Sequence, residues 1–339
     1  MRVRPRCLPR PSESASFPTL FRSILVAAFA AEGCGPQVTP APDAAAPDAD
    51  RPEQARTRLL TPGAAPHRAL RYTPQAGLTQ AADLGMTTEL ELGATGQKMP
   101  TALPKTRMVI DAKVTALDAN GGVSFQLAIA EADLADGASP GVTRAGEKLA
   151  EVIRGMKGLA GDKATDARGL SRRFSLAFPE GREGPMTTAA LRPVVQGFER
   201  AIDQMTVPFP EEAIGVGGKW EVTQKVVEAG MALDQTTTFE VTRIEGARVS
   251  LAFTVTLAAP PGKLESRFAN GLAAEVMRLA GSGEGTIEVD LGKVLPVALS
   301  TRNRIAMGLE LDAPGGNGGN TEKRTLDVEM RVALEAKSR

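Results

Sequence analysis

Apolar and polar residues alternate along most of the chain beyond about residue 68. In residues 84–92, leucine, methionine and threonine alternate with glycine, threonine and glutamate. Such a two-residue period is typical of a β-strand that buries one face. Residues 108–116 and 123–129 repeat it, and residues 118–122 between them, Asp-Ala-Asn-Gly-Gly, have the chemistry of a tight turn. These residues predict a β-hairpin.

The rest of the chain continues this pattern, with a few helical interruptions. Strands are predicted over residues 174–178, 220–228, 233–244, 248–258, 286–291, 295–305 and 324–334. Apolar residues recur at helical spacing in residues 142–159 and 191–205, which predicts two helices with one apolar stripe each. A short third helix is predicted around residues 264–279.

These elements predict an α+β fold dominated by antiparallel sheet, with about 9–11 strands in hairpins and two or three covering helices. The sheet is expected to curve into a half-barrel. The folded part is predicted to span residues 67–338, as one domain or as two similar halves, 67–210 and 211–338. The hairpin sequences VTALDANGGVSF and VTRIEGARVSL, residues 114–125 and 241–251, match at several positions. Internal duplication and the general likeness of hairpins both explain that match.

The apolar stripes of the helices raise the question of what fills the interior. The candidate lining residues are Leu149, Val152, Met156, Leu191, Val195, Phe198 and Ile202. They can close a core or roof a cavity, because the sequence period is the same in both cases. A content of only 4% aromatic residues favours a gap that an acyl chain could fill. Dense packing is nevertheless the rule in protein interiors.

Near the N-terminus, several arginines precede an apolar run at residues 24–31. The run is far shorter than the roughly 20 residues that a membrane-spanning helix needs. A positive flank, a short apolar run and small residues are typical of a secretory signal peptide, predicted here as residues 1–33. The ending Ala-Glu-Gly-Cys, residues 31–34, resembles the lipobox of bacterial lipoproteins. That resemblance implies cleavage before Cys34 and its acylation; secretion with an unmodified Cys34 is the alternative.

Cysteine usage agrees with a lipid anchor. The chain has two cysteines, Cys7 and Cys34, and Cys7 would leave with the signal peptide. Residues 34–66 are rich in Pro, Ala and Asp without an apolar period, which predicts a disordered tether. We therefore expect an exported protein of the cell envelope, anchored to the outer membrane through Cys34 and facing the periplasm or the cell surface.

Two further resemblances concern the folded part. Residues 209–222, FPEEAIGVGGKWEV, resemble the stretch that introduces the second half of certain uncharacterised bacterial secreted lipoproteins. The likeness rests on Pro210, Gly215, Gly217 and Trp220, and it implies no activity. The expected sheet with covering helices is also similar to the half-barrels of LolA-type and LppX-type periplasmic lipid carriers, which is an analogy of fold alone.

A serine-hydrolase motif is present but chemically incomplete. Residues 137–141, GASPG, fit G-x-S-x-G between a strand and a helix. Pro140 follows the serine and has no backbone N–H, yet the oxyanion hole needs that donor. The single histidine, His67, also precedes the serine. Ser139 is better explained as the N-cap of a helix that begins with Pro140.

The other motifs predict structure more than chemistry, and we expect no cofactor. Residues 215–220, GVGGKW, lack the phosphate-loop spacing and predict a turn before a strand. Residues 281–285, GSGEG, miss the dinucleotide pattern, and residues 314–320, PGGNGGN, predict a loop between strands. One histidine and no usable cysteine provide too few ligands for a zinc site.

Carboxylate pairs and single aromatic residues also have structural explanations. Glu89 and Glu91 fall on the solvent side of a predicted strand, and Glu211 and Glu212 lie beside a turn, so solvated surface is favoured over a glycosidase pair. Two aromatic side chains could stack on a ligand, but packing in the protein is the commoner outcome. These two are Tyr72 and Trp220.

Charge and motifs together exclude several classes of function. The 40 Lys and Arg residues balance the 40 Asp and Glu residues, so no basic surplus indicates a nucleic-acid partner. The first hypothesis is a non-catalytic, lipid-anchored interaction or scaffold module with an unknown envelope partner. The alternative is a carrier that binds a lipid or another hydrophobic ligand between sheet and helices. A serine hydrolase is a remote third hypothesis.

Overall fold

Long antiparallel strands make up most of the described chain. The computed structural model describes residues 55–94, 97–135, 144–177, 199, 201–203, 205–228, 231–263, 274–314 and 321–339. The strands are β1 (Arg56–Thr61), β2 (Thr79–Ala94), β3 (Gln97–Ala102), β4 (Thr106–Leu117), β5 (Val123–Leu134), β6 (Ala160–Thr165), β7 (Ser171–Ala177), β8 (Lys219–Glu228), β9 (Met231–Glu245), β10 (Arg248–Ala259), β11 (Gly262–Lys263), β12 (Ala274–Asp290), β13 (Ala298–Pro314) and β14 (Thr321–Ser338).

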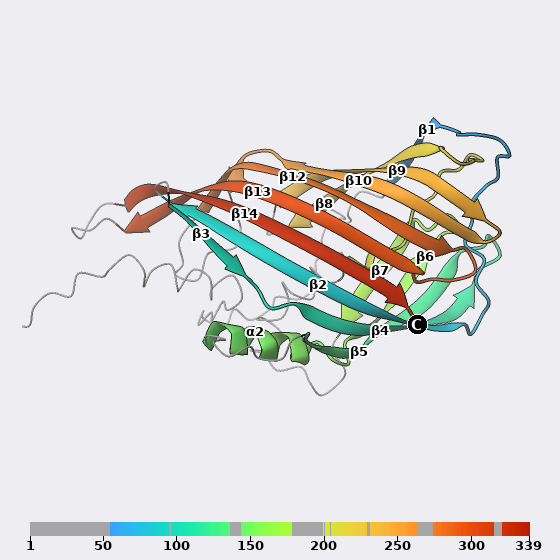
Figure 1. Ribbon diagram of the computed structural model, residues 1–339, viewed down its shortest axis with the longest axis horizontal. Coiled ribbons are helices and arrows are strands. Elements are labelled where there is room, and N and C mark those ends of the chain that lie inside the picture. Colours follow the sequence, from blue (N-terminus) through green and yellow to red (C-terminus); the bar gives the residue numbers. More distant parts are fainter. Residues whose placement is uncertain are drawn as a thin grey trace, which may run out of the picture.

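All of these strands belong to one 14-stranded sheet. Its order is β1-β8-β9-β10-β12-β13-β14-β2-β4-β5-β6-β7, while β3 pairs with β2 and β11 with β12. Figure 1 shows the long strands curving round, with helix α2 (Arg144–Gly155) beside β4 and β5. The predicted class, an antiparallel α+β fold that resembles a half-barrel, is confirmed. There are more strands than predicted, because short strands such as β3 and β11 give no readable alternation.

The helix predicted around residues 264–279 is wrong where the structure describes it. Residues 274–279 begin β12, which runs on through the GSGEG stretch; residues 264–273 lie outside the described chain. A register shift between Val276 and Arg278 turns Met277 outward. Val276 and Leu279 are therefore both buried although they lie three residues apart. Buried residues three positions apart are also typical of an amphipathic helix, which explains why the sequence predicted a helix here.

The folded part also begins earlier than its predicted boundary at residue 67. Strand β1, which falls inside the segment predicted as a tether, pairs antiparallel with β8. Gly215 donates its backbone N–H to the carbonyl of Pro62 at 2.8 Å, which ties the chain after β1 to the turn before β8. The prolines that flank β1 indicated disorder, but β1 is a short edge strand, which pairs with one neighbour and leaves the backbone groups of its other edge unpaired within the sheet.

The hairpins β4–β5 and β9–β10 share a β-bulge at the matching position. Thr115 is an extra residue in β4, and its hydroxyl donates to the carbonyl of Ser124 at 3.1 Å. Thr242 is the matching extra residue in β9, and its hydroxyl donates to the carbonyl of Ser250 at 3.0 Å. β-bulges of this kind are built features of a strand pair.

The turns that lead into these hairpin units agree as well. Gly77 donates its N–H to the carbonyl of Val114 at 3.1 Å, and Gly217 donates to that of Val241 at 2.8 Å. Both glycines have a φ of 78°. Strands β8 to β14 and strands β2 to β7 follow each other along the sheet. Of the two explanations for the sequence match, these shared details favour internal duplication.

We expect Gly217→Ala to lower the free energy of unfolding by about 1–2 kcal/mol, because an L side chain is strained at this left-handed φ. No atom lies within 4 Å of the added Cβ, so the loss would come from backbone strain alone. Urea denaturation of both proteins measures it. The control is Gly262→Ala, where the Cβ is equally free of neighbours and no left-handed φ applies. Equal stability of the two variants would contradict the prediction.

Candidate functional site

A cavity of about 510 Å³ lies against the sheet. Eight strands contribute residues to its wall: β2, β4, β8, β9, β10, β12, β13 and β14. Ile153 of α2, Met156 and the segment 201–208 contribute from the other side. Because one cavity touches all of these strands, it occupies the concave face of the sheet.

The strand period decides which residues reach this cavity. On β9, Leu233, Gln235, Thr237 and Phe239 line it, and the residues between them point to the convex face. The same alternation brings inward every second residue of β8, β10 and β13. The described wall is therefore set by the alternation that predicted the strands.

Glycines on β12 leave part of the inner face without side chains. Gly281, Gly283 and Gly285 alternate with exposed residues, so they share the inward face. A Cβ on Gly283 would lie 1.9 Å from Oδ1 of Asn303, and one on Gly285 would lie 2.5 Å from the ring of Phe253. The GSGEG stretch thus lets neighbouring side chains lie flat on the backbone, and it serves as strand and not as a nucleotide loop.

Polar side chains interrupt the apolar wall of the cavity. Gln235, Thr237 and Thr301 are only 7%, 8% and 7% exposed. Gln235 Nε2 donates to Thr237 Oγ1 at 3.5 Å, and Thr301 Oγ1 donates to Oδ1 of Asn303 at 3.4 Å. Both distances are at the long limit for hydrogen bonds. Burying a polar group with such a poor partner costs about 1–3 kcal/mol. A contribution to the stability of the sheet therefore does not explain why these polar residues are present.

A row of aromatic rings joins the main core to the cavity. Ring centroids are 5.5 Å apart for Tyr72 and Phe209, 5.9 Å for Phe209 and Trp220, 5.2 Å for Trp220 and Phe239, and 5.7 Å for Phe239 and Phe253. Phe239 and Phe253 line the cavity. Trp220 is fully buried and donates its indole N–H to the carbonyl of Pro208 at 2.8 Å. The prediction that Tyr72 and Trp220 pack within the protein is confirmed.

A buried lysine holds the segment beside the cavity. Lys163 of β6 is 1% exposed, and its Nζ lies 2.9 Å from Asp203 Oδ1 and 3.0 Å from Thr206 Oγ1. Burial lowers the pKa of Lys163, and the attraction of Asp203 partly opposes that shift. Asp203 and Thr206 also line the cavity. Sequence reasoning missed this lysine because β6 was not predicted.

The predicted lining residues divide between cavity, core and the undescribed chain. Met156 lines the cavity and is buried. Ile202 belongs to the main core, and Val152 packs against that core. The following lie outside the described part: Leu191, Val195, Phe198, the side chain of Leu149, the predicted lipidation site Cys34 and the motif serine Ser139. The strand residues that form most of the described wall were not chosen, although their two-residue period could have identified them.

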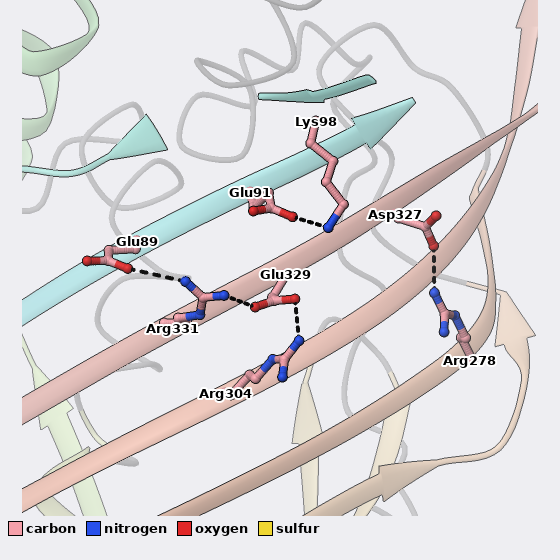
Figure 2. A network of polar contacts seen from close by, with 8 residues as sticks. All are labelled: Glu89, Glu91, Lys98, Arg278, Arg304, Asp327, Glu329 and Arg331. Atoms are coloured by element: carbon pink, nitrogen blue, oxygen red, sulfur yellow. Dashed lines mark hydrogen bonds and ion pairs between the residues drawn. The ribbon is translucent and has the colours of Figure 1, made fainter. Parts of the chain in front are cut away.

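The convex face of β2, β13 and β14 is polar and charge-paired. Figure 2 shows Arg331 between Glu89 and Glu329, at 3.8 and 2.6 Å, and Arg304 at 2.7 Å from Glu329. Glu91 pairs with Lys98 at 2.7 Å. The hydrogen bond from Arg304 is the largest cause of a lowered pKa of Glu329. Surface pairs of this kind add little stability, about 0–1 kcal/mol each. Glu89 and Glu91 therefore belong to a hydrated surface, as predicted.

Fold and cavity together define a β-rich half-barrel protein with a mostly apolar interior site. Residues 195–294 match a family described as a family of unknown function, DUF6263. That segment includes β8, β9 and β10. No curated protein is similar enough in sequence to match. Among the described residues, none of the helices has the length and apolar character to cross a membrane.

Three solved structures are distant matches, each with a TM-score of 0.20 or below. OccK2 (OpdF) of Pseudomonas aeruginosa is 7% identical, with a TM-score of 0.20 over 78% of this chain and 99% of that one. OccK11 (OpdR) of the same organism is 7% identical, with a TM-score of 0.20 over 79% of this chain and 100% of that one. The outer membrane protein opdK, also from Pseudomonas aeruginosa, is 6% identical, with a TM-score of 0.17 over 77% and 99%.

We expect Asp203→Ala to lower the free energy of unfolding by about 3 kcal/mol, because it leaves Lys163 buried without its counter-ion. Adding Lys163→Met should restore most of that loss, since no buried charge remains. Denaturant unfolding of the single and double variants measures both steps. The control is Asp327→Ala, which breaks an exposed pair with Arg278 and should cost less than about 1 kcal/mol. A loss at Asp203 no larger than at Asp327 would contradict the prediction.

Proposed function

We propose that the protein is a non-catalytic carrier that binds a hydrophobic ligand on the concave face of its sheet. The observation that supports this most directly is the cavity of about 510 Å³ bounded by eight strands, α2 and the segment 201–208. Ligand sites typically measure about 300–1,000 Å³ and are mostly apolar with a few placed polar groups. The described wall has that composition.

A filled core would explain the same sequence but not a space of this size. Protein interiors pack densely, and voids larger than a water molecule are few. The sequence leaves two hypotheses open, a carrier and a tethered interaction module, and the presence or absence of a cavity distinguishes them. The observed cavity favours the carrier. The analogy to LolA-type and LppX-type half-barrels points the same way, as a likeness of architecture only.

The proposal includes export and a lipid anchor at Cys34. Its support is the short apolar run at residues 24–31, the lipobox-like residues 31–34 and the loss of Cys7 on cleavage. Strand β1 begins at Arg56, so a tether of roughly 20 residues would separate the anchor from the sheet, with a coil span of about 25 Å. The carrier would then work within a short reach of the membrane surface.

Val255→Phe tests the binding site. Val255 lines the cavity, so the larger phenyl ring there would take up part of the cavity volume. We expect the dissociation constant for the apolar fluorescent probe N-phenyl-1-naphthylamine to rise at least about tenfold, which corresponds to about 1.4 kcal/mol. Fluorescence titration of the folded variant measures it.

The matched control is Thr256→Phe, the next residue on the same strand, which is exposed on the convex face. This variant adds the same ring to the outer surface and should bind the probe as the wild type does. Equal binding by the Val255 and Thr256 variants, or no probe binding by the wild-type protein, would overturn the proposed function.

Cys34→Ser tests the anchor in the native host or a related one. We expect the wild-type protein in the membrane fraction, with an acylated N-terminal cysteine in its mass spectrum. The variant should lose the membrane association, since one serine hydroxyl does not substitute for the acylated thiol. Cys7→Ser is the control and should fractionate like the wild type. A wild-type protein that is recovered with an intact Met1, or with an unmodified Cys34, would contradict the anchor.

A further inference from the structure

Two strands of the cavity wall, β9 and β13, have the same order of apolar and polar residues on their inward faces, and β10 and β12 lie between them in the sheet. Along β9, the inward residues are Leu233, Gln235, Thr237 and Phe239. Along β13, the inward residues that line the cavity are Leu299, Thr301, Asn303 and Ile305. Each set reads apolar, polar, polar, apolar.

Strand pairing brings two of these polar positions, Thr237 and Asn303, to one level of the sheet. Thr237 pairs with Val255 on β10, which pairs with Gly283 on β12. Gly283 in turn pairs with Asn303 on β13. Gln235 also faces Gln224 of β8. Gln235 lies two residues to one side of this level and Thr301 two residues to the other. The polar side chains therefore form an oblique band across the concave face, which we call the polar band: Gln224, Gln235, Thr237, Thr301 and Asn303.

The polar band separates two apolar regions of the wall. Ile287, Leu299 and Leu334 lie on the side of the main core. Leu233, Leu257 and Ile305 lie on the side of the second, smaller apolar cluster. A ligand that fills the cavity along the strands would meet apolar wall, polar band and apolar wall in turn.

The polar band carries hydrogen-bonding groups but no charge. Asp203 is the charged residue among the described lining residues, and Lys163 is already paired with it. A carboxylate or phosphate inside this wall would lack a free cationic partner, and burying an unpaired charge is strongly unfavourable. The long contacts of Gln235 and Thr301 leave their groups poorly bonded within the protein.

We propose that the cavity takes a neutral amphiphile, with an uncharged hydrogen-bonding linkage such as an ester at the polar band and an apolar arm on either side. This inference rests on the proposed function and specifies its ligand class. The side-chain amides of Gln235 and Asn303 can donate to the oxygens of an ester, and the two apolar regions take the arms.

The test compares three ligands of similar length as competitors of N-phenyl-1-naphthylamine: hexadecane, hexyl decanoate and hexadecanoate. We expect the wild-type protein to bind hexyl decanoate about tenfold more tightly than hexadecane, and hexadecanoate most weakly. The double variant Gln235→Leu and Asn303→Leu should lose the preference for the ester and keep its affinity for hexadecane. Thr301→Val serves as a second, milder variant if the double variant does not fold.

The control is Gln126→Leu, which makes the same change at an exposed position of β5 and should keep the ester preference. If the wild-type protein binds hexadecane as tightly as the ester, or the carboxylate most tightly, this inference is overturned while the proposed carrier function stands. If neither the probe nor any of the three ligands binds, the proposed function itself fails. Retention of the ester preference in both polar-band variants would also overturn the inference.

Discussion

The two-residue period of the extended chain is the constraint on which the rest of this structure depends. Strands such as β12, β13 and β14 are long, and every second residue of each must face the concave side of a curved sheet. The aliphatic side chains that cover this wide concave face are too short to fill the space in front of it. The described covering segments, α2 and residues 201–208, leave a cavity between themselves and the sheet.

The two similar hairpin units use the same geometry for different purposes. Lys163 pairs with Phe125 in the first unit, where Ile287 pairs with Leu251 in the second. The lysine ties the segment 201–208 to the sheet through Asp203, whereas Ile287 helps to line the cavity. At this matching position, one unit therefore supports a covering segment and the other supplies cavity wall. Divergence at inward positions is the difference that an internal duplication would need to explain.

The two faces of the sheet also differ in how they treat polar groups. On the convex face, carboxylates such as Glu329 meet arginines from neighbouring strands and stay in contact with water. On the concave face, Gln235 and Thr301 are buried with only long hydrogen bonds. Water compensates polar groups outside, and a ligand with its own oxygen atoms would compensate them inside. That contrast is the basis for our proposal that the polar band binds a ligand.

By itself, the sequence determined the sheet, because alternation is a local property of strands such as β4 and β9. It also placed Glu89 and Glu91 on the hydrated face and Trp220 within the packing. Only the tertiary structure decided that β1 joins the sheet, that a bulge near Met277 replaces a predicted helix, and that Lys163 is buried. The sequence did not determine whether there is a cavity, because inward residues have the same period whether the space opposite them is filled or empty. The distance between the sheet and its covering segments decides this, and it depends on the curvature of the sheet and on segments remote in sequence.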